Sequence, residues 1–446
     1  MEQAKKAFEK LFWLLLLASP MLDFINGVWT YFRCGGDGGM LSSLDIKEIP
    51  GMSPSFLIRI AFLLMMTAYL FLNKKWKSVW MFVAIGDTWV LTVGYEFLRH
   101  AEFSYTADVQ YIVRFCYCLL VMLAYAVMLK RDGRPQEKLS AFIDKVLSAS
   151  LLALGLGVLV PYVFGVGFFT YADPLGYRGS RGFFYAGNDI TAVMMLMLPV
   201  VFAGWMSEKD VRKPAFSWLQ AIASALGFLA MLIIGTKTSF LAAGVTVLTM
   251  LGYSLLRGFG KKEWQYLKRV LAVFVLVLLV LGLLILICEN SPLETIWRSL
   301  TATSEYMEIK DTEEVVFSGR TSKLDLAVDD FKAALPLSAL VGVGRGSQSR
   351  IIEMDLLEVA LYYGILGCIT MLWLYVVQGV KVIIDLFRNF SLKNLGCCVA
   401  LGLCAGYLAM AGHTLFSVTA GFYFAFMIVY ARLFCSKKGM ETKILD

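Results

Sequence analysis

Long apolar runs alternate with short polar segments along almost the whole chain, from Leu11 to Phe434. Most of these runs are about 20 residues long, which is the length that a helix needs to cross the hydrocarbon core of a bilayer. The pattern predicts an all-α, polytopic membrane protein with about 12 transmembrane helices in a single membrane domain, residues 1–446. The predicted spans are residues 11–32, 56–72, 78–98, 112–129, 146–168, 188–206, 217–235, 240–256, 270–288, 354–378, 395–414 and 417–434.

One connecting segment, residues 289–353 between the ninth and tenth spans, is much longer than the others. Loops of this length usually carry a function or have structure of their own. Ser318 can cap a helix that runs from Gly319 to about Ala334 and ends before Pro336. One face of this helix is apolar, with Leu324, Val328, Phe331 and Leu335 at helical spacing. We therefore expect short helices in the long loop, with this one lying against the bundle or the membrane surface.

Composition agrees with a membrane protein, because 59% of the residues are hydrophobic and the mean hydropathy is +0.69. The net charge of +7 does not indicate a nucleic-acid partner, since the Lys and Arg residues concentrate on alternate connecting segments. That distribution predicts cytoplasmic termini and places the long loop on the outer face. The first apolar run continues past Pro20 without a small-residue cleavage site, so we expect an uncleaved first span. The nine Cys residues show neither a disulfide framework nor the spacing of a metal site.

Three acids, Asp23, Asp87 and Glu96, fall inside predicted spans. A charge at the centre of a membrane helix costs about 2.5–3.5 kcal/mol on insertion scales. Two interpretations stay open for these acids: a functional role, favoured slightly for Asp23, or an ion pair with a neighbouring cation.

Polar residues also gather at the predicted outer ends of several spans. The cations come from separate loops, and the acids begin the tenth span; the set is Arg178, Arg181, Lys237, Arg320, Arg345, Arg350, Glu353, Asp355, Glu358 and His413. They could be solvated loop charges and simple ion pairs. As a group they favour a pocket for an anionic headgroup with an acid or base beside it, because the planar fork of Arg binds two phosphate oxygens at once.

A metal site is a weaker interpretation of the same segment. Glu353 and Asp355 are separated by one residue, and this Glu-x-Asp pattern binds a divalent metal in some lipid-dependent glycosyltransferases. Two carboxylates alone are a weak metal signal, so we expect no metal and no other cofactor. The glycines of GVGRG, residues 342–346, follow no predicted strand, so they are not a dinucleotide-binding motif, and we expect them to let the chain bend back into the membrane.

Several short motifs resemble those of the O-antigen polymerase and O-antigen ligase superfamily. They are FSGR (317–320), GVG (342–344) and EMDLLEVALYYGILG (353–367) around the long loop, together with RGFFYAGN (181–188), TKTS (236–239) and AGH (411–413). The resemblance covers roughly residues 170–420, and the order of the motifs and the position of the long loop make it more specific than any motif alone. It implies a glycosyltransferase of the bacterial inner membrane that moves a glycan from undecaprenyl pyrophosphate to an acceptor hydroxyl at the outer face.

The resemblance also implies roles for the polar residues. Arg181, Lys237 and Arg320 would stabilise the departing pyrophosphate electrostatically. Glu353 is the first choice for the base and His413 the second. Asp355 and Glu358 would orient acceptor hydroxyls or pair with Arg345 or Arg350. The expected partners are the lipid-linked glycan, the bilayer and, in the cell, a flippase and a chain-length regulator, but no nucleic acid.

Three alternatives remain. Ligases of the superfamily have a His where this chain has Glu353, and an Arg is common near Lys237, so the departures favour a polymerase over a ligase without excluding either. A flippase or other transporter could also have twelve spans, although transporters usually show internal repeats and midplane sites that we do not find here. The motifs of the shape and division family of cell-wall polymerases do not match.

Overall fold

The structure, a computed structural model, describes residues 2–42, 54–99, 102–173, 176–207, 214–309, 320–348 and 352–436. Helices dominate it because nearly every apolar run can satisfy its backbone hydrogen bonds internally only as a helix. The first half contains α1 (Glu2–Arg33), α2 (Pro54–Leu72), η1 (Trp76–Ser78), α3 (Val79–Leu98), α4 (Tyr105–Arg131), α5 (Gln136–Val163), α6 (Gly187–Ser207) and α7 (Pro214–Ile234). The second half contains α8 (Lys237–Lys261), α9 (Gln265–Ile287), α10 (Pro292–Ile309), α12 (Arg320–Ala333), α13 (Ser338–Val341), η2 (Arg345–Ser347), α14 (Asp355–Gly367), η3 (Cys368–Leu372), α15 (Trp373–Arg388), α16 (Leu392–Met410) and α17 (Val418–Phe434).

Helices coincide with all of the predicted spans. Among the described residues, ten helices are long and apolar enough to cross a membrane, and α14, η3 and α15 together form one of them. Two further apolar helices, at Trp218–Ile234 and Val418–Phe434, are shorter. Ten of the predicted spans therefore correspond to these long helices, and the other two correspond to the two shorter apolar helices. Large apolar side chains such as Trp80, Leu286 and Phe387 point away from the protein, as they would toward lipid.

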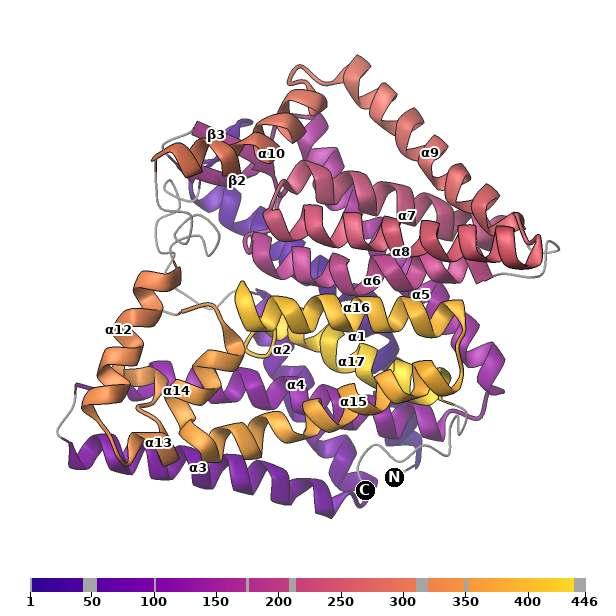
Figure 1. Cartoon of the computed structure of the whole chain (residues 1–446). Coiled ribbons are helices and arrows are strands. Elements are labelled where there is room, and N and C mark those ends of the chain that lie inside the picture. The colour runs from indigo at the N-terminus through magenta and orange to yellow at the C-terminus, as the bar shows by residue number, and fades with distance from the viewer. Residues whose placement is uncertain are drawn as a thin grey trace.

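The two ends of the bundle differ. Figure 1 shows α10, α12 and the strands β2 and β3 together at one end of the helices, on the left. The beginning of α1 and the end of α17 lie near the connection between α4 and α5, because Glu2 pairs with Arg131 and the Gln136 side chain donates to the carbonyl of Leu433. The start of α1 and the end of α17 therefore lie at the same end of the bundle.

A small sheet adds an element that the all-α prediction missed. Its order is β1 (Met40–Leu41), β2 (Gly167–Asp173), β3 (Gly176–Ser180), with β1 parallel and β3 antiparallel to β2. The predicted fifth span ran to residue 168 and so absorbed the start of β2. The helix α5 ends at Val163, and Gly165, at φ 63°, lies in the turn that leads into the strand.

The predicted helix at 319–334 is present as α12, and its apolar residues Leu324 and Phe331 pack on the core. Ser318, its predicted cap, lies outside the described residues. The loop also contains α10 and α13, as expected.

The glycines of GVGRG bring the chain back against α14. The helical path of α14 is interrupted at Gly364, at φ 60°, which leaves carbonyl groups without their usual partners. The backbone nitrogens of Val343 and Gly344 donate to two of these carbonyls, those of Leu361 and Tyr362. A methyl group on Gly342 would overlap the backbone of Tyr362. The close approach therefore requires glycine there.

Candidate active site

The site begins at the N-terminus of α14. Asp355 and Glu358 lie in its first turn and are fully buried. Glu353 lies two residues before the helix, at φ 69°, a conformation that residues other than glycine rarely adopt. Its backbone nitrogen donates to Glu358 Oε1 at 2.9 Å. This bond fixes the turn that brings all three acids together.

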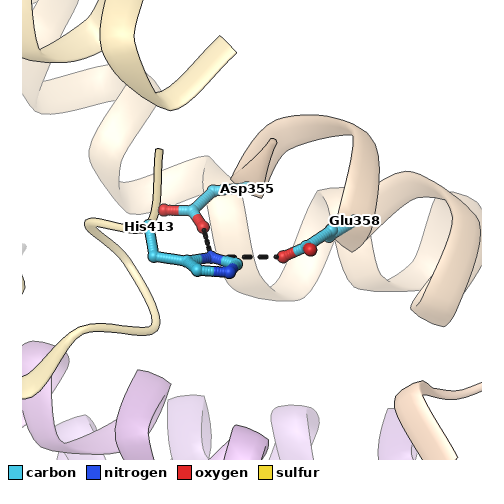
Figure 2. Close-up of side chains that lie close together, drawn as sticks. All are labelled: Asp355, Glu358 and His413. Atoms are coloured by element: carbon cyan, nitrogen blue, oxygen red, sulfur yellow. Dashed lines mark hydrogen bonds and ion pairs between the residues drawn. The ribbon is translucent and has the colours of Figure 1, made fainter. Parts of the chain in front are cut away.

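His413 completes an acid–histidine cluster with Asp355 and Glu358 (Figure 2). His413 lies in the connection between α16 and α17, and its Nδ1 is 2.8 Å from Asp355 Oδ1 and 3.5 Å from Glu358 Oε2. The other oxygen of Asp355 accepts the backbone N–H groups of Thr414 and Leu415, each at 2.6 Å. Glu358 Oε2 also accepts a hydrogen bond from Tyr111. Asp355 thus anchors the loop that carries His413.

His413 is positively charged at neutral pH. Burial alone would lower the pKa of its imidazole, but the hydrogen bond with Asp355 and the negative charge of Glu358 raise it to about 9. Its Nε2 has no hydrogen-bond partner among the described residues, although that atom is buried. The imidazolium can therefore donate a hydrogen bond to a substrate oxygen from Nε2.

A second cluster joins the long loop to the same turn. Arg320, at the start of α12, is 2.8 Å from Glu353 Oε2, and Lys323 is 3.4 Å from Glu353 Oε1. Burial alone would raise the pKa of Glu353, but these two cations hold it below its ordinary value. Glu353 is consequently ionised at neutral pH. We call Glu353, Arg320 and Lys323 the Glu353 cluster.

Two more cations lie near Arg320. Thr236 caps α8 by accepting the backbone N–H of Ser239, which places Lys237 in the first turn of that helix. The charges of Arg320 and Arg178 act on Lys237, so the three cations are close in space although they come from β3, α8 and α12. Three cations from separate elements make the local potential positive, which suits the binding of an anion.

Arg181 directly follows β3, and its backbone N–H donates to the carbonyl of Phe168 in β2. Its guanidinium lies over the ring of Phe168 at 5.6 Å, and its Nε has no hydrogen-bond partner among the described residues. Burial lowers the pKa of Arg181 to about 10, so it remains charged at neutral pH. No contact between described residues joins its side chain to the Glu353 cluster.

Arg345, another predicted residue, takes no direct part in these clusters. The guanidinium of Arg345 donates to the carbonyl of Gln348, and its backbone N–H donates to Asp108 at 2.6 Å, so Arg345 belongs to the GVGRG turn. Arg350 lies outside the described residues. Among the described residues, Asp355 and Glu358 therefore do not pair with Arg345, and the alternative pairing with Arg350 stays a prediction.

The three intramembrane acids have different environments. Asp23 pairs with Arg59 at 2.6 Å and accepts a hydrogen bond from Thr419, and Glu96 pairs with Arg99 at 2.8 Å. The ion-pair interpretation holds for these two acids. Asp87 is exposed on α3.

Sequence reasoning overlooked three residues that matter here. Asp108 accepts hydrogen bonds from Trp89, Tyr363 and the GVGRG backbone, and so holds that turn against α3, α4 and α14. Tyr111 contacts Glu358 from the next turn of α4. Lys323 lies three residues after Arg320. Of the three, only Lys323 could have been identified from the sequence, because residues three apart in the predicted helix share a face and Lys323 would therefore lie beside Arg320.

The donor atoms of Asp355, Glu358 and His413 all lie within 4.8 Å of one another, a spacing that could hold a metal ion. The site does not fit one well. Asp355 Oδ2 already accepts two backbone N–H groups, and Asp355 Oδ1 faces the imidazole. Glu358 Oε1 accepts the backbone N–H of Glu353. We assign the three residues to an ion-pair cluster rather than to a metal centre.

Taken together, the site offers cations for an anionic leaving group, an ionised carboxylate and an imidazolium that can donate. Such a set suits group transfer from a phosphorylated donor to a hydroxyl.

Comparison with known proteins identifies the family of the chain. No curated protein matches the chain. The family model described as "O-antigen ligase like membrane protein" matches residues 5–297 and 300–435, almost the entire sequence. The chain therefore belongs to the O-antigen ligase-like membrane proteins, a family of multi-pass integral membrane proteins.

Proposed function

We propose that this protein is a polysaccharide polymerase of the bacterial cytoplasmic membrane. It transfers a growing glycan from undecaprenyl pyrophosphate to the next lipid-linked repeat unit at the outer face. The observation that carries the proposal is the Glu353 cluster. There the carboxylate of Glu353 lies 2.8 Å from Arg320, which is close to two further cations, Arg178 and Lys237. A base for the acceptor and positive charge for the leaving group therefore lie side by side.

The reaction is a displacement at the anomeric carbon of the donor sugar. The acceptor hydroxyl oxygen forms the new glycosidic bond, and the bond from the anomeric carbon to the phosphate oxygen breaks. The electron pair of that bond leaves with the pyrophosphate, where Arg178, Lys237 and Arg320 stabilise the charge. The hydroxyl proton passes to the Glu353 carboxylate.

His413 takes a different role from the one its residue type first suggests. With a pKa of about 9 it is protonated at neutral pH and cannot act as the base in the free enzyme. Its free Nε2 position suits a hydrogen bond to a substrate oxygen. This supports Glu353, the first choice from the sequence, as the base.

A ligase that transfers the glycan to a different acceptor, such as a lipid core, is the second candidate, and the family match favours it. Two departures favour a polymerase instead: Glu353 stands where the ligases that this chain resembles have a His, and Lys237 stands near a common Arg.

The test is deletion of the gene in its native host, followed by sizing of the glycans released from the carrier lipid. Single repeat units on the outer face of the membrane are the expected result. Long chains that remain on the carrier would establish a ligase. Single units trapped at the cytoplasmic face would establish a flippase and overturn the glycosyltransferase proposal.

A further inference from the structure

Lys323 contacts the carboxylate of Glu353 on the side opposite Arg320. Arg320 Nη2 lies 2.8 Å from Oε2, and Lys323 Nζ lies 3.4 Å from Oε1. Both cations come from α12 and lie three residues apart, on the same face of the helix. Each carboxylate oxygen therefore has its own cation.

The main chain of Glu353 is fixed independently of these contacts. Its positive φ of 69° is unfavourable for a residue with a side chain, and the bond from its nitrogen to Glu358 holds it there. The side chain is only partly buried, with 29% of it exposed. Its direction therefore depends on the charges around it, which are Arg320 and Lys323 on α12, Glu358 on α14 and His413 after α16.

Arg320 has two competing anions. It pairs with Glu353, and it also lies near Lys237 and Arg178, where the proposed function places the pyrophosphate. A guanidinium binds phosphate in a bidentate fork, and the doubly or triply charged pyrophosphate is the stronger anion. When the donor binds, the contact between Arg320 and Glu353 Oε2 is the one that weakens.

We propose that Lys323 is a positioning residue, which holds Glu353 by Oε1 while the donor pyrophosphate draws Arg320 away from Oε2. This inference rests on the proposed function. The exchange leaves Oε2 as the oxygen that receives the acceptor proton. A lysine suits this role because its compact ammonium on a flexible stem follows the carboxylate without forming a second fork.

Steady-state kinetics of the purified full-length protein in lipid nanodiscs, with a lipid-linked repeat unit as donor and acceptor, test the inference. Lys323→Ala should lower kcat roughly 10- to 100-fold, the cost of a misplaced catalytic group. The KM for the donor should stay within about twofold, since the pyrophosphate cations remain. Lys323→Arg should recover most of the lost kcat. Lys332→Ala, which removes an exposed cation from the last turn of the same helix, is the matched control and should behave as wild type.

A double variant separates positioning from general stability. Glu353→Gln should have the same low rate with and without Lys323→Ala, because Lys323 acts only through Glu353. A wild-type kcat for Lys323→Ala would overturn the inference while leaving the proposed function intact. So would a raised KM with unchanged kcat, which would make Lys323 a pyrophosphate ligand, or a further loss of rate in the double variant. If the wild-type protein transferred no glycan, the proposed function would fail, and the inference with it.

Discussion

Two clusters of charged residues lie at opposite ends of the helices, and they differ in the number of cations around each carboxylate. Near the end of α17, Arg432 pairs with Asp385 and donates to the Gln378 side chain at 3.1 Å; we call these three residues the Arg432 cluster. One cation meets one anion there, and no buried side-chain nitrogen or oxygen in this cluster lacks a partner among the described residues. At the Glu353 cluster, two cations share one carboxylate, and Arg178 and Lys237 add further positive charge.

Burial of an ion pair is therefore not what distinguishes the proposed active site, because the side chain of Arg432 is as buried as that of Arg320. The difference is that several cations lie around one carboxylate, beside His413, whose buried Nε2 has no hydrogen-bond partner among the described residues. A one-to-one pair suits a structural role, whereas several cations grouped at one site suit the binding of an anion.

The largest expected effect is on catalysis, and it should separate the two clusters. Arg320→Ala and Glu353→Gln should each lower kcat/KM by about 10²-fold or more, because they remove leaving-group stabilisation and the base. Arg432→Ala should leave the specific activity of the folded fraction near that of wild type. Rates of chain extension in nanodiscs measure this. Equal losses of kcat/KM in all three variants would mean that the two clusters do not differ in function.

The free energy of unfolding should decrease most for Arg432→Ala, the reverse of the order expected for activity. Arg432→Ala leaves Asp385 without its cation, and breaking one side of a buried pair typically costs about 3–5 kcal/mol. Thermal unfolding in detergent should therefore show a clear decrease in Tm. Arg298→Ala, at an exposed pair with Glu294 on α10, is the control and should change the stability by less than about 1 kcal/mol. A Tm decrease of the same size for Arg298→Ala would contradict the distinction between buried and exposed pairs.

A smaller effect is expected on the pH dependence of stability at the proposed site. The pKa of His413 is raised from 6.5 to about 9 in the folded protein, so folding takes up a proton at pH values between these two. The stabilisation from its pair with Asp355 is fully present below about pH 6.5 and is lost as the pH rises through about 9.

Melting curves of wild type and Asp355→Asn, collected from about pH 6 to about pH 10, check this linkage. The Tm of wild type should fall with rising pH, and the fall should be shallower in Asp355→Asn. Parallel curves for the two proteins would show that this pair does not raise the pKa of His413. The Arg432 cluster contains no histidine, so Arg432→Ala should shift the whole curve without changing its slope.

The membrane helices were predictable because apolar runs of bilayer length have few other stable structures. The helix at 319–334 was predictable for a similar reason, since its apolar positions repeat at helical spacing. The sheet was missed because β2 follows α5 directly and continues its apolar run, so hydropathy alone shows no boundary between them. Gly165 and Gly167 were the available turn signals.

The proposed site was predictable as a set of residue types but not as a set of pairs. Arg345 and Arg320 come from the same loop, yet only Arg320 reaches Glu353, because the backbone of the GVGRG turn is tied to Asp108. The bond between His413 and Asp355 joins positions 58 residues apart. No local pattern encodes such a contact, because it depends on how α14 packs beside the connection between α16 and α17.

The smallest expected effect concerns metal removal. The sequence pattern of Glu353 and Asp355 and the spacing of Asp355, Glu358 and His413 both resemble a cation site, so chelation is an informative challenge. Both oxygens of Asp355 and the Oε1 atom of Glu358 already accept hydrogen bonds or face the imidazole, and a divalent ion would have to displace these donors. Dialysis against a chelator should therefore leave kcat and KM unchanged, and added Mg²⁺ or Mn²⁺ should not stimulate the enzyme. A loss of activity on chelation that Mg²⁺ or Mn²⁺ restores, and that Asp355→Asn makes insensitive to metal, would show that this cluster opens to bind a cation. The acids would then not serve the acceptor alone, because a metal that they hold would itself contact the phosphates of the donor.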